Sequence, residues 1–272
     1  MDTGLKRMLS YGTGPESLPV RHSPGPETGE EMYTFESRIR YSEINEYEYL
    51  SMEGLIDYFQ DCSTFQSEDL GIGIDYLKSM DQAWIVNYWQ IDVYRYPRLG
   101  ERVVIGTSPY QLRGFMGLRN FMMETVEGER LVNANSVWSL FNMKKMAPAR
   151  ITPEITEKYI LGEPFDMEYT PRKISLPGEG EVLCVREKPL MTVQEHHLDT
   201  NHHVNNVQYV RLALSTLPEG LVIRRLRIMY QKQAYLGDQM LPRAFRTSEN
   251  TWLIRLDGLD GKAFCITEVT VD

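Results

Sequence analysis

Apolar residues in two stretches of this chain recur with the period of a helix. In the first half, the spacing i, i+3, i+4 and i+7 links Met52, Leu55, Ile56 and Phe59. Ser51 stands directly before them and is the expected N-cap. In the second half, a narrower stripe links Val204, Val207, Val210 and Leu214. The sequence therefore predicts one helix in each half.

Each predicted helix is followed by apolar runs of strand length, separated by turn residues. In the first half these runs are WIVNYWQIDVY, RVVIGTSPY, FMGLRNFMMETV and LVNANSVWSLFNM. In the second half they are LVIRRLRIMYQ, QMLPRAFR, TWLIRLDG and AFCITEVTV. A helix followed by an antiparallel meander, given twice, predicts an α+β protein with two antiparallel sheets, each wrapped around a central helix.

The two halves also resemble each other in sequence. Residues 91–103 and 228–240 align at an offset of 137 residues, which places one Leu-Gly-acid turn on another. The helices align at an offset of 154, so the first half holds 17 more residues between its helix and its sheet. Residues 67–83 (SEDLGIGIDYLKSMDQA) are the expected extra material. We interpret the chain as an internal duplication.

The segment between the halves, residues 162–181, is rich in proline, glycine and charge, which indicates an ordered linker. We therefore expect a first domain over residues 32–161 and a second over residues 182–272. Residues 1–31 lack the apolar core of a signal peptide and are dominated towards their end by proline, glycine and glutamate. They are expected to form a disordered tail.

Composition narrows the classes of function. A chain of 272 residues with 42% hydrophobic residues can bury a core, and no apolar run reaches the roughly 18 residues of a membrane span. The net charge of −9 argues against a nucleic-acid partner, which needs clustered Lys and Arg. Three widely spaced cysteines argue against a disulfide framework and favour a cytoplasmic location.

Four of the five histidines fall within HHLDTNHHVNN, residues 196–206. A metal site is one interpretation, but adjacent histidines point to opposite faces of an extended chain, and no cysteine lies nearby. A polar helix entrance is a second interpretation, with Asp199 and Asn201 as turn and N-cap residues. That interpretation leaves the clustering of histidines unexplained.

A hydrolytic site is the third interpretation. Asp199, Asn201 and His203 are two residues apart, so they would share one face of an extended segment. A histidine can take a proton from water near neutral pH, and a carboxylate can orient the imidazole. Asparagine and helix-start amides can stabilise an oxyanion. The chain has no Gly-x-Ser-x-Gly motif, and this stretch has no cysteine, so a covalent route has little support.

LDTNHHVNNVQY, residues 198–209, closely resembles the Asp-x-Asn-x-His-Val-Asn-Asn signature of the acyl-acyl-carrier-protein thioesterases. These are the plant-type enzymes that end fatty-acid synthesis, together with their bacterial relatives. The first-half phrases RIRYSEINEYEYLSMEGLIDYFQD and YRYPRLGERVVIGT also look like this family, so the resemblance covers about residues 32–272. It implies a tandem double hotdog fold, with a catalytic set in the C-terminal hotdog and no metal or organic cofactor.

Position by position, the resemblance assigns catalytic roles to Asp199, Asn201 and His203. The family generally places a glutamate on the strand after the second helix, where this chain has Gln233, and plant members follow it with a cysteine where this chain has Ala234. Glutamine cannot act as a base, but it can position a water molecule. We therefore expect His203, oriented by Asp199, to activate water, while Asn201 and helix-start amides polarise the carbonyl.

The implied reaction is hydrolysis of fatty acyl-acyl-carrier protein, which releases a free fatty acid and ends chain elongation. The implied partner is an acidic carrier protein that bears the acyl chain on a phosphopantetheine arm. A homodimer is one expected assembly, because many hotdog proteins pair. The alternatives are an acyl-CoA thioesterase and a non-catalytic acyl-binding hotdog protein, and Gln233 favours the second of these.

The substrate's acyl chain needs an apolar tunnel, which we expect in the first hotdog. The candidate acyl-binding residues are Met52, Leu55, Ile56, Phe59 and Trp89. Burial in an ordinary core is the alternative for each of them. Two basic clusters are candidates for docking the carrier protein: Lys144-Lys145 with Arg150, and Arg224-Arg225 with Arg227.

Overall fold

The computed structural model describes residues 32–178, 180–199 and 201–272; the predicted tail over residues 1–31 lies outside this part. The first half contains β1 (Tyr33–Arg38), α1 (Met52–Asp69), α2 (Ile74–Ser79), β2 (Gln82–Val93), β3 (Arg102–Arg113), β4 (Met116–Thr125), β5 (Arg130–Asn142), β6 (Ala147–Pro148) and α3 (Pro153–Thr156). The second half contains β7 (Cys184–Glu187), β8 (Met191–Thr192), α4 (Asn206–Leu214), β9 (Ile223–Tyr230), β10 (Gln239–Arg246), β11 (Thr251–Asp257) and β12 (Ala263–Val271). The eight long strands coincide with the eight predicted apolar runs.

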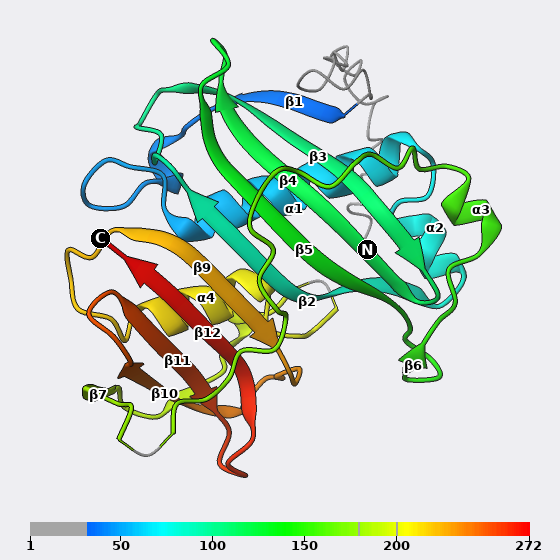
Figure 1. Ribbon diagram of the computed structural model, residues 1–272. Helices are drawn as coiled ribbons and strands as arrows, with labels where there is room; N and C mark the ends of the chain where they lie inside the picture. Colours follow the sequence, from blue (N-terminus) through cyan, green and yellow to red (C-terminus); the bar gives the residue numbers. More distant parts are fainter. Residues whose placement is uncertain (1–31, 179, 200) are drawn as a thin grey trace, which may run out of the picture.

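The strands of the described residues form one 12-stranded antiparallel sheet with the main order β1-β3-β4-β5-β2-β9-β12-β11-β10-β7 (Figure 1). The α+β prediction is confirmed, and the two predicted sheets are joined edge to edge by the pairing of β2 with β9. In this ladder Gln90 lies opposite Arg227, its equivalent at the offset of 137 residues. A pseudo-twofold axis therefore passes between these two residues.

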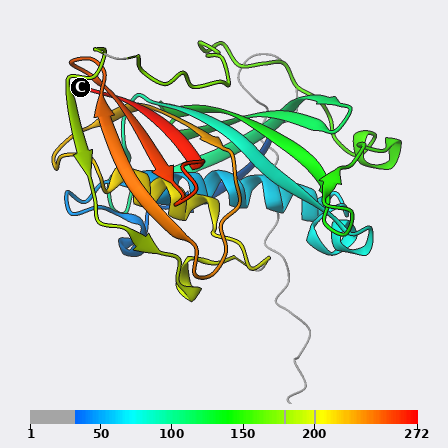
Figure 2. The ribbon, with the colours of Figure 1, turned by 90° about the horizontal axis from the view of Figure 1, so that it is seen from below.

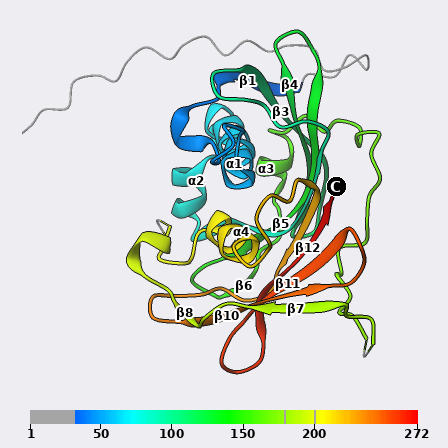
Figure 3. The same cartoon turned by 90° about the vertical axis from the view of Figure 1, so that its left-hand side faces the viewer.

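Both long helices lie on the concave side of the sheet, side by side (Figure 3). The apolar stripe of α1 is fully buried, and the Ser51 side chain accepts a hydrogen bond from the Gly54 N–H at 3.1 Å, as the sequence predicts. One cluster of buried apolar side chains continues from the first half into the second. The helices of the described part are too short or too polar to cross a bilayer.

The segment after α3 runs over the opposite, outer face of the sheet (Figure 2). Polar side chains of the sheet hold it: Asn120 accepts a hydrogen bond from the Phe165 N–H at 3.1 Å, and Gln90 accepts one from the Thr170 N–H at 3.0 Å. Arg227 donates to the carbonyl of Pro171. The first part of the segment predicted as a linker is therefore an ordered strap across both halves.

Candidate active site

The histidine stretch forms a tight turn at the entrance to α4. Leu198 pairs with Val204, and the Asp199 carboxylate accepts the N–H groups of Asn201 at 2.8 Å and of His203 at 3.2 Å. His202 sits in the left-handed region with φ of 62°. The prediction of an extended segment is wrong at this point, because Asp199 folds the backbone back on itself.

The first half contains the same turn 154 residues earlier. Asn45 accepts the N–H groups of Tyr47 at 3.0 Å and of Tyr49 at 3.1 Å, and Glu48 has φ of 65°. Both copies of the duplication therefore use the side chain at this position to form the turn. Asn45, Tyr47 and Tyr49 occupy the positions of Asp199, Asn201 and His203, so the chemistry of these side chains distinguishes the second copy from the first.

The N-cap of α4 is Asn205, whose side chain accepts a hydrogen bond from the Val207 N–H at 2.9 Å. The expectation of Asn201 as the N-cap is therefore wrong. His197 belongs to the preceding 3-10 turn, where its Nδ1 accepts the Gln194 N–H at 3.1 Å, and burial lowers its pKa. Within the described residues, no group of three His, Cys, Asp or Glu side chains is placed to hold a metal ion.

A cavity of about 420 Å³ with both polar and apolar walls brings together all four predicted catalytic residues, Asp199, Asn201, His203 and Gln233, and we call it the polar cavity after them. Its opposite wall comes from the first half and consists mainly of β2, from Ala83 to Asn87, with parts of β5. The site therefore lies between the two halves, with its polar side chains on one and its wall on the other.

The backbone of Ala234 fixes the relative position of Gln233 and the histidine turn. Its carbonyl accepts the Val204 N–H at 2.9 Å, and its N–H donates to the Tyr209 hydroxyl at 2.9 Å. The His203 ring meets the Tyr235 ring edge-on, with centroids 4.9 Å apart. Among the described residues, no hydrogen bond joins the Asp199 carboxylate to the imidazole of His203, so the carboxylate holds the backbone of His203 and not its ring.

The cysteines of the chain lie away from this cavity. Cys62 and Cys265 are buried, and burial raises the pKa of the Cys265 thiol to about 12. Cys184 is exposed on the edge strand β7. None of the three lines either cavity described for this chain. A thiol nucleophile has no support in this geometry.

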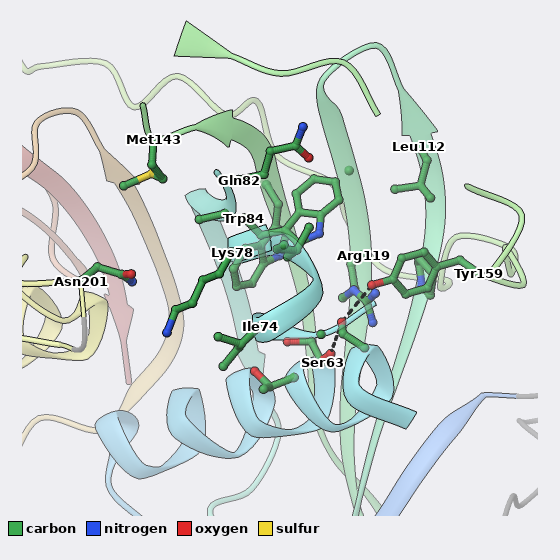
Figure 4. Close-up of a pocket in the computed structure, with 18 of the residues that line it drawn as sticks. Ser63, Ile74, Lys78, Gln82, Trp84, Leu112, Arg119, Met143, Tyr159 and Asn201 are labelled. Carbon is green, nitrogen blue, oxygen red and sulfur yellow. Dashed lines mark hydrogen bonds between the residues drawn. The ribbon is translucent and has the colours of Figure 1, made fainter. Parts of the chain in front are cut away.

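A second, mostly apolar cavity of about 430 Å³ adjoins the first, and the two share Ala83, Trp84, Met143 and Asn201. Figure 4 shows Asn201 on one side of this cavity and Arg119 with Tyr159 on the other, with Trp84 between them. Helix α2 covers the cavity through Ile74, Leu77 and Lys78. Helix α2 comes from the predicted 17-residue insertion and has no counterpart after α4 among the described residues.

The predicted acyl-binding residues lie elsewhere. Met52, Leu55, Ile56, Phe59 and Trp89 are all 4% exposed or less, in the core between α1 and the sheet. None of them lines either cavity. The part of α1 that does line the apolar cavity is its last two turns, with Ser63, Thr64 and Ser67. These small polar residues carry no apolar signal, and the insertion directly after them is the feature of the sequence that marks the cavity.

The arrangement of these elements is a double hotdog fold. An acyl-ACP thioesterase from Bacteroides thetaiotaomicron superimposes with a TM-score of 0.78 at 23% identity, over 89% of this chain and 98% of that one. The 12:0-ACP thioesterase of Umbellularia californica gives a TM-score of 0.77 at 18% identity, over 89% of this chain and 97% of that one. These solved structures establish the fold.

The sequence places the chain more narrowly. Residues 30–159 match the acyl-ACP thioesterase N-terminal domain, and residues 185–257 match the C-terminal domain. The chain therefore belongs to the acyl-ACP thioesterase family. The palmitoyl-acyl carrier protein thioesterase of Cuphea hookeriana is 29% identical over 200 residues, which are 69% of this chain and 48% of that protein. The chain spans about half the length of the curated relatives it matches first.

Proposed function

We propose that this chain hydrolyses the thioester of a fatty acyl chain carried by an acyl carrier protein and releases the free fatty acid. The position of Asn201 carries this proposal, since it lines both the polar cavity with His203 and the apolar cavity behind Trp84. A thioester carbonyl at Asn201 has its acyl chain in the apolar cavity and its sulfur towards the outside. Membership of the thioesterase family supports the same reaction.

In the proposed mechanism, His203 takes a proton from a water molecule held by Gln233, and the resulting hydroxide attacks the carbonyl carbon. The side-chain amide of Asn201 and the Asn206 N–H stabilise the oxyanion, since the Val207 and Gln208 N–H groups of the first turn of α4 already bond to Asn205 while Asn206 lines the cavity. The carbon–sulfur bond then breaks, and the leaving thiolate takes the proton from His203. Asp199 holds the backbone of His203 by accepting its N–H group, so its carboxylate lies next to the imidazolium that forms during the reaction.

The carrier protein is proposed to dock at the mouth of the cavities through lysines. Lys144 and Lys145 stand between Met143 and Pro148, which line the polar cavity, and no ion pair with a described residue engages them. Lys78 also lines the apolar cavity, and Lys232, which pairs with Asp260 at 3.3 Å, lines the polar one. The other basic cluster predicted from the sequence is already paired: its partners are Asp272 for Arg224, Asp92 and Glu168 for Arg225, and Glu268 for Arg227.

A free-thiol release assay with acyl-carrier substrates tests the reaction. His203→Ala is expected to lower kcat by about a hundredfold or more, whereas Gln233→Glu is expected to be neutral or faster because it restores a carboxylate next to the water. A wild-type rate in His203→Ala would reject the proposed base. Equal rates on acyl-CoA would favour the acyl-CoA alternative, and binding without turnover would favour the non-catalytic alternative that Gln233 suggests.

A further inference from the structure

Arg119 on β4 is a buried arginine in the wall of the apolar cavity, with 8% of its surface exposed. Its Nη1 donates to Gln66 Oε1 and, at 3.1 Å, to Thr107 Oγ1. The guanidinium carbon lies 5.3 Å from the centroid of the Tyr159 ring, and the Tyr159 hydroxyl is 2.9 Å from Ser67 Oγ. All these contacts are with neutral groups.

The other arginines of the sheet that are largely buried have acidic partners. Arg227 pairs with Glu268 at 2.6 Å, and Arg225 pairs with Asp92. No carboxylate in the described part of the chain forms an ion pair with Arg119. A charge taken out of water without a counter-charge is strongly disfavoured, and burial lowers the pKa of Arg119 accordingly. Arg119 therefore has no counter-charge among the described residues.

Part of the guanidinium remains available to a ligand. Beyond the two hydrogen bonds of Nη1, the polar partner of the guanidinium among the described residues is the neutral hydroxyl of Tyr159. Arg119 lines the apolar cavity, so its remaining donors lie at the wall of that space. A methyl-ended acyl chain in this cavity would cover these donors without satisfying them, which is unfavourable.

We propose that Arg119 recognises an oxygen group at the far end of the acyl chain, a carboxylate foremost and a hydroxyl next. This inference rests on the proposed function, because it places the thioester at Asn201 and the other end of the chain towards Arg119 (Figure 4). A carboxylate supplies the missing anion and accepts charge-assisted hydrogen bonds from a guanidinium that is largely removed from water. The preferred substrates are then acyl chains with a polar end.

Steady-state hydrolysis of carrier-bound chains tests this preference. Sets of chains matched in length, ending in a methyl, a hydroxymethyl or a carboxylate group, are compared through kcat/KM. We expect the order carboxylate, hydroxymethyl, methyl at the length that spans the cavity, with about tenfold or more between first and last. Equal values, or a preference for methyl ends at every length, would overturn the inference.

Variants distinguish the effect of the Arg119 charge from the effect of cavity size. Arg119→Met is expected to abolish the preference, so that kcat/KM for carboxylate and hydroxymethyl ends falls to or below the value for methyl ends, and removing a buried charge without a partner need not destabilise the fold. Arg119→Lys is expected to keep part of the preference. Leu112→Ala, in the same cavity wall, is the matched control and should shift the preferred length but not the order of end groups. A preference that survives in Arg119→Met would overturn the inference.

A binding measurement distinguishes this inference from the proposed function. Free dicarboxylic acids should raise the Tm of the wild type more than monocarboxylic acids of the same length, and Arg119→Met should lose this difference. If this holds but no thioester is hydrolysed, the proposed function fails and the recognition of a polar end stands. If thioesters are hydrolysed without any order of end groups, and the Tm difference is absent, the recognition by Arg119 fails alone.

Discussion

Asp199 has two properties, a side-chain oxygen and a negative charge, and its equivalent Asn45 in the first half has only the first. Its carboxylate accepts the backbone N–H groups of Asn201 and His203, and Asn45 does the same for Tyr47 and Tyr49 in the first half with a neutral amide oxygen. A side-chain oxygen at this position is therefore sufficient for the turn. The negative charge is the additional property of Asp199, and it lies beside the proposed catalytic histidine.

Asp199→Asn is expected to keep the fold and to lower the rate. The amide oxygen preserves both backbone hydrogen bonds, so Tm should fall by no more than about 4 °C. Loss of the negative charge next to the imidazolium that forms during the reaction should lower kcat by about a hundredfold in a thiol-release assay. Asn45→Asp, the same exchange reversed in the other copy, serves as the control and should leave kcat unchanged. Unaltered turnover in Asp199→Asn would show that residue 199 only shapes the backbone.

The sequence predicted polar residues that the structure brings together in one cavity, but not their geometry. Spacing alone suggested an extended segment, whereas the side chain of Asp199 and the positive φ of His202 create a turn. The acyl-binding prediction selected the apolar stripe of α1, such as Leu55 and Phe59, because periodicity marks the face of a helix that packs on the sheet. The wall of a cavity consists of side chains from several elements that do not pack against one another. No periodic pattern in the sequence therefore identifies it.

At the scale of elements, the two halves differ in the segment after each helix. Helix α1 is 18 residues long and is followed by a second helix, α2. Helix α4 is 9 residues long and is followed by β9, with no further helix between them in the described residues. In the sequence, the difference between the alignment offset of the sheets, 137 residues, and that of the helices, 154 residues, indicates this insertion. The last turns of α1 and helix α2 line the apolar cavity together with β2, β3, β4 and β5, so the cavity belongs to the first copy.

Gly117→Ala is expected to shorten the acyl chain that the protein prefers. Gly117 lines the apolar cavity on β4, and an added Cβ would lie 3.1 Å from Leu112 and 3.5 Å from the Trp84 ring. Either the side chains shift or the cavity narrows, and overpacking of this kind excludes the longer chains first. Competition among carrier-bound chains of graded length measures the optimum. An optimum that stays in place while Tm is unchanged would show that the acyl chain does not pass Gly117.

At the scale of the whole molecule, charge is unevenly distributed. The chain carries a net charge of −9, yet each cavity has a lysine in its wall: Lys78 of α2 in the apolar cavity and Lys232, which pairs with Asp260, in the polar one. Lys144 and Lys145 follow the lining residue Met143 in the turn between β5 and β6. The arginines of β9 look equally available in the sequence, but the fold uses them to join the two halves and the strap. The structure, but not the sequence, distinguishes the arginines that form ion pairs within the fold from the lysines that are available to a partner protein.

The carrier-bound substrate should therefore be used less efficiently as salt rises. Raising the ionic strength from about 0.05 M to about 0.5 M is expected to lower kcat/KM severalfold, because exposed charges steer an acidic partner only over a Debye length. A Lys144→Gln, Lys145→Gln double variant should have a lower kcat/KM at low salt and a weaker salt dependence, with kcat preserved. Arg224→Gln, which breaks the exposed pair with Asp272, is the control and should keep the full salt dependence. An acyl thioester without a carrier protein should show little salt dependence in any variant; if it responds as strongly as the carrier-bound substrate, salt acts on the enzyme itself and not on docking.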